Sequence, residues 1–164
     1  AIMAFVGQNY GAGKYDRMKK SVGVCLKLAL GMTVVLSILL LLFARYCFRI
    51  FTDNPEVIQY AIQIVSYFVP FYFIWTFIEV LANALRGAGD ALIPMIISVG
   101  GICGLRILWV LFVVPHWHTL LGISICYPVS WFITAAILIL YYKKGRWLRN
   151  APLSPAPPAP RLPQ

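Results

Sequence analysis

Residues 22–43 read VGVCLKLALGMTVVLSILLLLF, an apolar stretch that contains a single charged residue, Lys27. A helix needs about 20 mostly apolar residues to cross the hydrocarbon core of a bilayer, so this stretch can span one. Backbone amides find no water inside a membrane, and a spanning segment of this kind must therefore be helical. Three further stretches have the same character, at residues 57–85, 91–114 and 120–142. We predict an all-α polytopic membrane protein with four full transmembrane helices.

The composition of the whole chain also indicates a membrane protein. Of the 164 residues, 61% are hydrophobic and only 12% are charged, and the mean hydropathy is +0.81. A soluble domain carries about a quarter charged residues, so a soluble enzyme, a secreted disulfide scaffold and a disordered chain are excluded. The net charge of +9 comes from basic residues that lie mostly near the ends of the apolar stretches, where orientation in a bilayer accounts for them. We therefore expect the lipid bilayer, and no nucleic acid, as a partner.

The basic residues are divided unequally between the two sides of the predicted spans. Eleven of the 14 Lys and Arg residues lie on one side, and two, Arg45 and Arg49, lie on the other. The cytoplasmic loops of membrane proteins carry the excess of Lys and Arg. We therefore expect the loops at residues 8–14 and 86–90, together with the C-terminus, to be cytoplasmic in a plasma or inner membrane.

The two ends of the chain differ from the four spans. Residues 1–7 are apolar and follow no initiator Met or basic signal region, so we interpret them as the end of a fifth membrane helix. The chain would then be the C-terminal part of a longer protein. Residues 146–164 are basic and then rich in proline, which favours an extended or disordered chain. We assign residues 1–145 to the membrane region and residues 146–164 to a disordered cytoplasmic tail.

One acidic residue, Glu79, lies inside the second predicted span. An ionisable group inside a membrane helix costs roughly 2.5–3.5 kcal/mol and is a candidate functional group by default. Glu79 lies about 9 Å from the inner end of its span, where it could exchange a proton; alternatively, it extends to the interface or pairs with a cytoplasmic Lys or Arg. The residues around it predict one helix face that lines a substrate or ion pathway, although such a face can also be core or lipid-facing. This face comprises Phe71, Trp75, Thr76, Glu79 and Asn83.

Proline, glycine and arginine residues inside the spans predict further local features. Pro70 and Pro128 lack a backbone donor, and we expect each to kink its helix. The sequence GGICG at residues 100–104 predicts close packing against another helix. Arg106 lies inside the third span, and we expect its long side chain to extend to the outer headgroups. The alternative for Arg106 is a role toward a substrate or counter-ion.

A Gly-Ala-Gly loop between two helices occurs twice, in GQNYGAGK at residues 7–14 and in LRGAGD at residues 85–90. With these two motifs, and with LFAR at residues 42–45 and IFTD at residues 50–53, the chain resembles the multidrug and toxic compound extrusion (MATE) transporters. The resemblance covers nearly the whole chain before the proline-rich tail. It implies that the two loops are cytoplasmic hinges, formed by Gln8, Gly11, Gly13, Arg86, Gly87, Gly89 and Asp90.

The resemblance also implies an architecture and an activity. MATE transporters have twelve helices in two six-helix lobes, and this chain would supply the end of the eighth helix and helices nine to twelve. Members of the family exchange a proton or sodium gradient for the export of amphipathic organic compounds, and we expect no other cofactor. Glu79 would tune the charge of the cleft, while Phe71 and Trp75 would contact the substrate. The missing N-terminal lobe would be a necessary partner, so we expect the chain alone to be inactive.

Two other kinds of membrane protein remain as alternatives: a lipid-linked sugar flippase of similar architecture, and a small four-helix accessory or scaffold protein. We expect no catalytic residues, because the spans contain no paired acids and the chain has no nucleophile or phosphate-binding motif. We also expect no metal site, because His116 and His118 have no acidic or cysteine partner nearby and the four cysteines form no CxxC pair.

Overall fold

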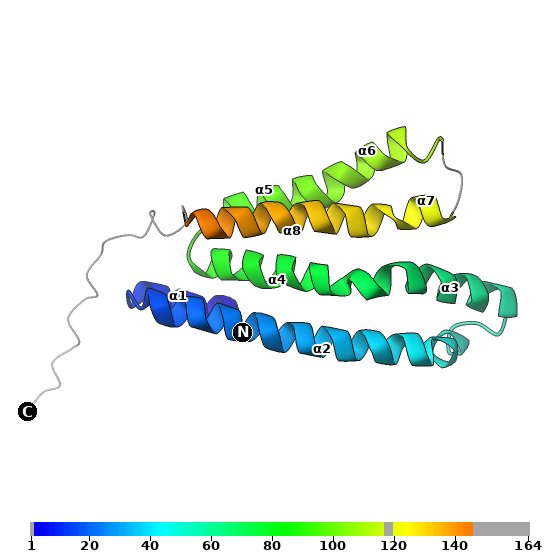
Figure 1. The fold of residues 1–164 in the computed structure, drawn as a ribbon, viewed down its shortest axis with the longest axis horizontal. Coiled ribbons are helices and arrows are strands. Elements are labelled where there is room, and N and C mark those ends of the chain that lie inside the picture. Colours follow the sequence, from blue (N-terminus) through cyan, green and yellow to red (C-terminus); the bar gives the residue numbers. More distant parts are fainter. Residues whose placement is uncertain (1, 117–119, 146–164) are drawn as a thin grey trace, which may run out of the picture.

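The computed structural model describes residues 2–116 and 120–145, and in these residues all regular structure is helical. The ribbon in Figure 1 shows long helices that lie roughly side by side. In chain order the elements are α1 (Ile2–Gly11), α2 (Tyr15–Arg49), α3 (Pro55–Phe68), the 3₁₀ turn η1 (Val69–Phe71), α4 (Tyr72–Gly87), α5 (Leu92–Val99), the π-helical segment η2 (Gly100–Gly104), α6 (Leu105–Phe112), α7 (Leu120–Ser124) and α8 (Cys126–Lys144).

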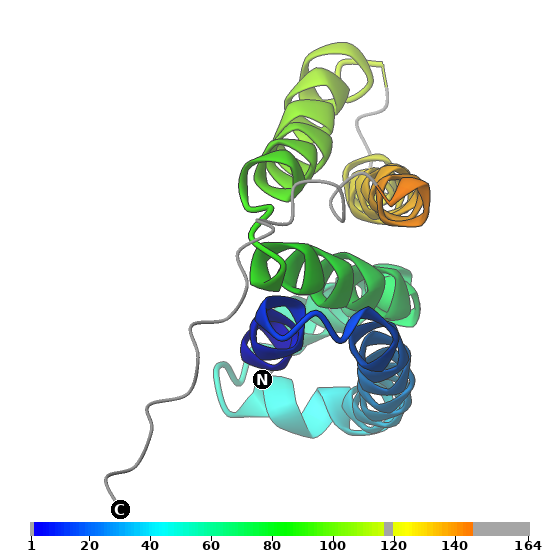
Figure 2. The ribbon, with the colours of Figure 1, turned by 90° about the vertical axis from the view of Figure 1, so that its left-hand side faces the viewer.

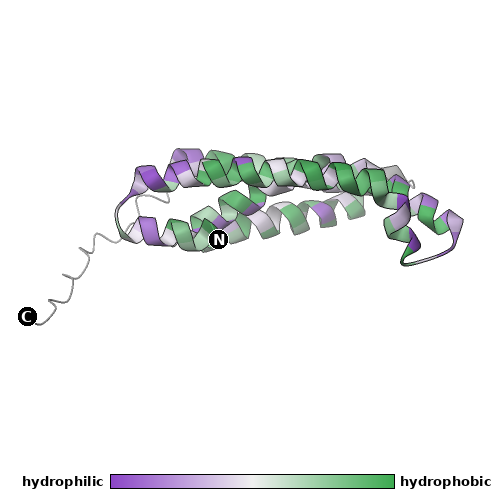
Figure 3. Cartoon of the chain, turned by 90° about the horizontal axis from the view of Figure 1, so that it is seen from below, coloured by the Kyte–Doolittle hydropathy of each residue, from purple (hydrophilic) through white to green (hydrophobic). Residues whose placement is uncertain are grey.

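Four helical stretches are long and apolar enough to cross a membrane. They are Tyr15–Arg49, Pro55–Gly87, Leu92–Phe112 and Gly122–Lys144. Figure 3 shows hydrophobic residues along the lengths of these helices, with most of the hydrophilic residues towards their ends. The predicted all-α polytopic membrane fold with four full spans is therefore confirmed. The predicted disordered tail, residues 146–164, lies outside the described residues.

Helix α4 lies at the centre of the bundle. It packs against α1, α2, α5 and α8, and Figure 2 shows α1 and α2 on one side of it with α8 and α5–α6 on the other. The loop between α1 and α2, the loop between α4 and α5, and the end of α8 all lie at the same end of the bundle (Figure 1). The two glycine loops therefore share one side, as the distribution of Lys and Arg predicts.

Three of the spans contain an interruption. The turn η1 contains Pro70 and separates α3 from α4, and η2 is the glycine-rich segment between α5 and α6. Pro128 lies in the first turn of α8, directly after the break between α7 and α8 at Ile125. The first amides of a helix have no intrahelical acceptor, so Pro128 costs little at this position. The kink expected at Pro128 is thus a break between two helices.

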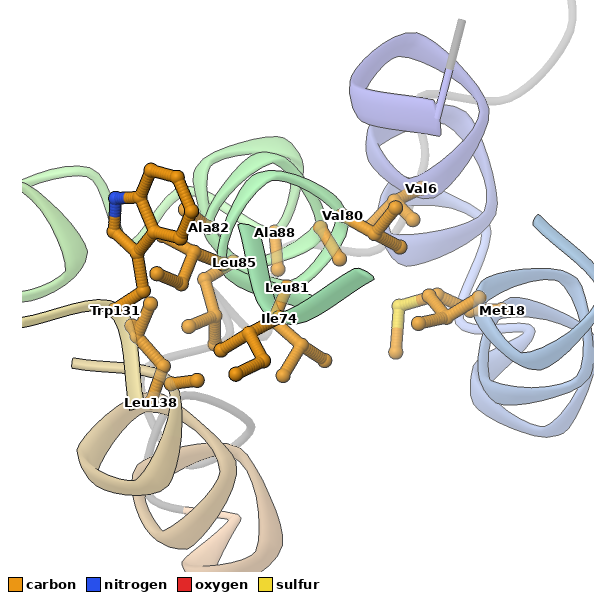
Figure 4. Close-up of a cluster of buried hydrophobic side chains, with 14 residues drawn as sticks. Val6, Met18, Ile74, Val80, Leu81, Ala82, Leu85, Ala88, Trp131 and Leu138 are labelled. Carbon is orange, nitrogen blue, oxygen red and sulfur yellow. The ribbon is translucent and has the colours of Figure 1, made fainter. Parts of the chain in front are cut away.

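The buried core consists of side chains from α4 and from the three helices around it, α1, α2 and α8 (Figure 4). Its most deeply buried large side chains include Met18, Leu85 and Leu138. Elsewhere large apolar side chains face outward, such as Leu28 and Leu42, each 70% exposed. An outward apolar surface of this kind suits contact with lipid, and inside a bilayer it provides no driving force between helices. Close packing must therefore hold the helices together.

Small residues provide that close packing at two helix crossings. A Cβ atom at Gly87 in α4 would overlap the Met3 backbone carbonyl of α1, and one at Gly101 in η2 would overlap the Thr134 side chain of α8. Gly100 and Gly104 have open space at the same atom. The close approach predicted for residues 100–104 is therefore made by Gly101 alone within the GxxxG region.

Candidate functional site

Three polar side chains lie in a row along α4. The Asn83 Nδ2 donates hydrogen bonds to the Glu79 carboxylate Oε2 at 3.0 Å and to the Glu79 backbone carbonyl at 2.8 Å. Arg86 Nη1 in turn donates to Asn83 Oδ1 at 3.4 Å. Residues three and four positions apart lie on the same face of a helix, which explains why these groups meet. We call Glu79, Asn83 and Arg86 the α4 polar row.

The α4 polar row lies on the open side of an otherwise buried helix. Glu79 is exposed, whereas Asn83 and Arg86 are half-buried. The positions on the other sides of the same turns are buried, namely Ile78, Val80, Leu81, Ala82, Ala84 and Leu85. A carboxylate that faces lipid is costly, so this side of α4 requires either water or a further protein surface.

The structure connects Glu79 to a basic residue through an amide. Within the described part of the chain, two hydrogen bonds connect Glu79 to Arg86 by way of Asn83. From the sequence, Arg86 is predicted only as a residue of the glycine loop, and its place in this row comes from the structure. The spacing 79, 83, 86 is the signal that could have identified it. Chemically, the row offers a carboxylate for a proton or cation, with a guanidinium at the end of the row nearest the glycine loop.

The other residues of the predicted face contact different neighbouring helices. Thr76 is buried and makes a 2.9 Å hydrogen bond with Thr33 of α2. Trp75 packs against Trp131 of α8, with the ring centroids 5.8 Å apart. Consecutive positions are rotated by about 100° around a helix, so Thr76 turns towards α2 although Trp75 turns towards α8. The structure thus places the Thr76 hydroxyl in a contact between α4 and α2, and the role of this face in a pathway stays a prediction.

Phe71 lines an apolar cavity of about 540 Å³ between the α3–α4 region and α8. A cavity of this size can hold a drug-sized molecule. Pro128 also borders it, and Pro70 directly precedes Phe71, so both helix breaks lie at this cavity. The full lining consists of Tyr67, Phe71, Ile74, Ile125, Pro128, Val129, Phe132 and Ile133.

The two glycine loops meet at one end of the bundle. Residues of both loops line a common groove of about 720 Å³, which includes Gly11, Gly87, Gly89 and Asp90. Gly89 has a φ of +89°, a conformation that glycine adopts without steric cost. The Tyr141 hydroxyl of α8 donates a 2.5 Å hydrogen bond to Asp90, so the second loop is attached to the last span.

The remaining loop residues predicted as hinges lie around this groove. Gln8 and Gly13 are exposed, and Gly13 has a φ of +68°. Arg86 lies in the last turn of α4 and belongs to the α4 polar row as well. The pivoting role of both loops stays a prediction.

A bundle of four membrane-length helices, with a polar row along its central helix and an apolar cavity beside that helix, defines an integral polytopic membrane protein. A sequence model of the MatE family matches residues 1–112, which is more than half of the chain. The chain belongs to the MatE family.

Individual relatives agree with this family assignment. The chain is 27% identical over 147 residues to the probable multidrug resistance protein YoeA of Bacillus subtilis. The aligned region is 87% of this chain and 31% of that protein. The chain is 28% identical over 155 residues to the probable multidrug resistance protein NorM of Thermotoga maritima, covering 94% of this chain and 33% of that protein. The multidrug resistance protein PmpM of Pseudomonas aeruginosa is 30% identical over 99 residues, or 60% of this chain and 21% of PmpM.

The chain spans about a third of the length of the first two relatives.

In the part of the chain that the structure describes, no group of three or more His, Cys, Asp or Glu side chains could hold a metal ion. His116 Nδ1 forms a 3.0 Å hydrogen bond with the carbonyl of Phe112, the last residue of α6, and His118 lies outside the described residues.

Proposed function

We propose that this chain forms part of a cation-coupled transporter that exports drugs or other amphipathic organic compounds. The observation that carries the proposal is the α4 polar row, a carboxylate, an amide and a guanidinium on the open side of the central membrane helix. The names of the relatives support drug export, since YoeA and NorM are each described as a probable multidrug resistance protein. The coupling ion in this proposal is a proton or sodium, and no other cofactor takes part.

The residues of the site have separate roles in this proposal. Glu79 binds the coupling ion or responds to its binding, and Asn83 and Arg86 adjust the charge around that carboxylate. Phe71 contributes an aromatic wall to the apolar cavity, where the apolar part of a substrate is held. Trp75 packs on Trp131 and shapes the region between α4 and α8.

The proposal also includes a further set of helices as a partner. The open side of α4 needs water or protein against it, and the relatives are about three times as long as the matched region. We propose that an N-terminal lobe completes the pathway, and that this chain alone does not transport. The membrane is a plasma or inner membrane, with the glycine loops and the C-terminus in the cytoplasm.

Substitution of Glu79 tests the role of the polar row. Glu79→Gln keeps the size of the side chain and the acceptor for Asn83 but removes the charge. In cells that produce the protein from its natural gene, we expect this variant to lose most gradient-driven drug efflux or to lose its pH or sodium dependence. Asp53→Asn, which neutralises an exposed acid between α2 and α3, is the matched control and should leave efflux unchanged. Normal efflux of Glu79→Gln across pH and sodium concentrations would remove Glu79 from the mechanism.

Immunoblotting tests the partner lobe separately. An antibody against residues 143–149 should detect a membrane protein far heavier than the 18.4 kDa of this chain. A band near 18.4 kDa would instead require two copies to assemble one pathway, and would favour an accessory or scaffold protein.

A further inference from the structure

Lys27 is the last charged residue before a long uncharged part of helix α2. Residues 28–44 carry no charge, and Arg45 follows them. At 1.5 Å per residue these 17 residues extend over about 26 Å, which is close to the roughly 30 Å thickness of the hydrocarbon core of a bilayer. Lys27 and Arg45 therefore lie at opposite boundaries of the hydrocarbon core. Lys27 is at the boundary nearer the two glycine loops, which adjoin the start of α2 (Figure 1).

Three basic side chains lie along the outward side of this part of α2. Arg17, Lys20 and Lys27 are all exposed, and their spacings of three and seven residues keep them on one side of a helix. The opposite side of the same turns contains Met18 and Val22, which are buried in the core. We call Arg17, Lys20 and Lys27 the α2 basic stripe.

The acidic residues of the chain leave the α2 basic stripe with a net positive charge. They are Asp16, Asp53, Glu56, Glu79 and Asp90. Asp53 and Glu56 lie beyond the far end of α2, and Glu79 and Asp90 accept hydrogen bonds from other side chains. Asp16 is the acid that lies in α2, where residues 15–27 contain four basic residues. An anion from outside the chain would therefore be attracted to this part of α2.

Apolar surface adjoins Lys27 on the same outward side. Val24 is 57% exposed and Leu28 is 70% exposed. Gly31, one turn further into the span than Lys27, has open space where a Cβ atom would lie, so an acyl chain has room against the helix there. Side chains of a helix lean towards its N-terminus, which directs the Lys27 ammonium out of the hydrocarbon core and towards the headgroups. A phosphate that is attached to acyl chains matches this combination of charge and apolar surface.

We propose that the α2 basic stripe binds an anionic phospholipid. The Lys27 ammonium binds the lipid phosphate, and an acyl chain of the lipid lies along Leu28 and Gly31. Lys20 and Arg17 lie about 10 Å and 15 Å further along the helix, and they attract the anionic headgroup through a field that weakens over about a Debye length. The site lies on the outward side of α2 and does not involve the α4 polar row.

Photo-crosslinking from one side chain identifies the lipid at this site. The protein, produced from its natural gene with p-benzoylphenylalanine in place of Leu28, is reconstituted in nanodiscs of equimolar phosphatidylglycerol and phosphatidylcholine with identical acyl chains. After illumination, mass spectrometry gives the ratio of the two lipids that are crosslinked to the protein. Leu42, which is also 70% exposed and lies near the other end of α2, is the matched control position. Because only lipid contact is measured, failure of this proposal leaves the proposed export function intact.

We expect phosphatidylglycerol to be crosslinked at position 28 about tenfold more often than phosphatidylcholine. Lys27→Gln should lower this ratio about fivefold, the effect of one basic residue near a membrane surface. Lys20→Gln should lower it by a smaller factor, and Lys27→Arg should retain it. Lys144→Gln removes the same charge from the end of α8, across α4 from α2 (Figure 2), and should leave the ratio unchanged. The ratio at Leu42 should be the same in all variants, which also reports that the bundle is intact.

Four results would overturn the site. Equal crosslinking of the two lipids at position 28 would show that this face does not select an anionic headgroup. An unchanged ratio in Lys27→Gln would remove the ammonium from the contact. An equal decrease in Lys144→Gln would assign the preference to general surface charge. Crosslinking of position 28 to protein in place of lipid would show that other helices cover this side of α2.

Discussion

The side-chain amide of Asn83 bonds both the backbone carbonyl and the carboxylate of Glu79, at 2.8 Å and 3.0 Å. A single amide group therefore fixes the position of the acidic side chain in the second span. The oxygen of the same amide accepts from Arg86, so a change at Asn83 affects both charged residues of the row at once.

The first prediction concerns this amide. Asn83→Leu should lower the free energy of unfolding by about 1 kcal/mol, because it removes hydrogen bonds to a charged group on an open face. Chemical unfolding in detergent, followed by circular dichroism, measures the change. Gln59→Leu, at an exposed amide of α3, is the matched control and should have a smaller effect. Equal stabilities of the two variants would show that the row does not hold Glu79.

The second prediction compares two glycines of η2. A methyl group at Gly101 would overlap the Thr134 side chain, whereas Gly104 has open space. Gly101→Ala should therefore destabilise the bundle by about 1–3 kcal/mol. Gly104→Ala should be neutral or stabilise by up to about 1 kcal/mol, since alanine favours helix over glycine. Thermal unfolding in the same detergent distinguishes the two, and an equal loss in both would contradict the packing at Gly101.

The third prediction concerns the contact between α2 and α4. Thr33 and Thr76 share a 2.9 Å hydrogen bond, and such bonds between membrane helices contribute about 0.6 kcal/mol on average and up to about 1.7. A double-mutant cycle with Thr33→Val and Thr76→Val should give a coupling energy in this range. A coupling energy of zero would show that this hydrogen bond does not stabilise the contact between α2 and α4.

The fourth prediction concerns the attachment of the second glycine loop. Tyr141→Phe removes the hydrogen bond to Asp90 and retains the ring. We expect amide hydrogen exchange in residues 88–91 to become about tenfold faster, because the loop opens at lower cost without a bond to a charged group. Tyr46→Phe, at an exposed tyrosine towards the end of α2, should leave this exchange unchanged. No change in Tyr141→Phe would mean that the backbone alone holds the loop.

Much of the candidate site could be predicted from spacing along α4. Glu79 and Asn83 are four residues apart on one helix, and local geometry alone brings them together. The contact of Thr76 with Thr33 of α2 could not be predicted in this way, because Thr33 lies 43 residues earlier in the chain. The contact of the Arg106 guanidinium with the Tyr127 ring of α8 could not be predicted either, because no local pattern reveals which helix lies opposite.

The sequence by itself determined the four spans, their helical form and that both glycine loops lie at the same end of the bundle. These follow from the exclusion of water from the bilayer and from the distribution of Lys and Arg, which act on each segment independently. Only the tertiary structure decided that α4 is central, that Gly101 makes the close contact with α8 and that Arg106 lies over Tyr127. Lipid is as apolar as the helix surfaces, so hydropathy cannot select which faces meet. Shape and a few hydrogen bonds between distant residues make that selection.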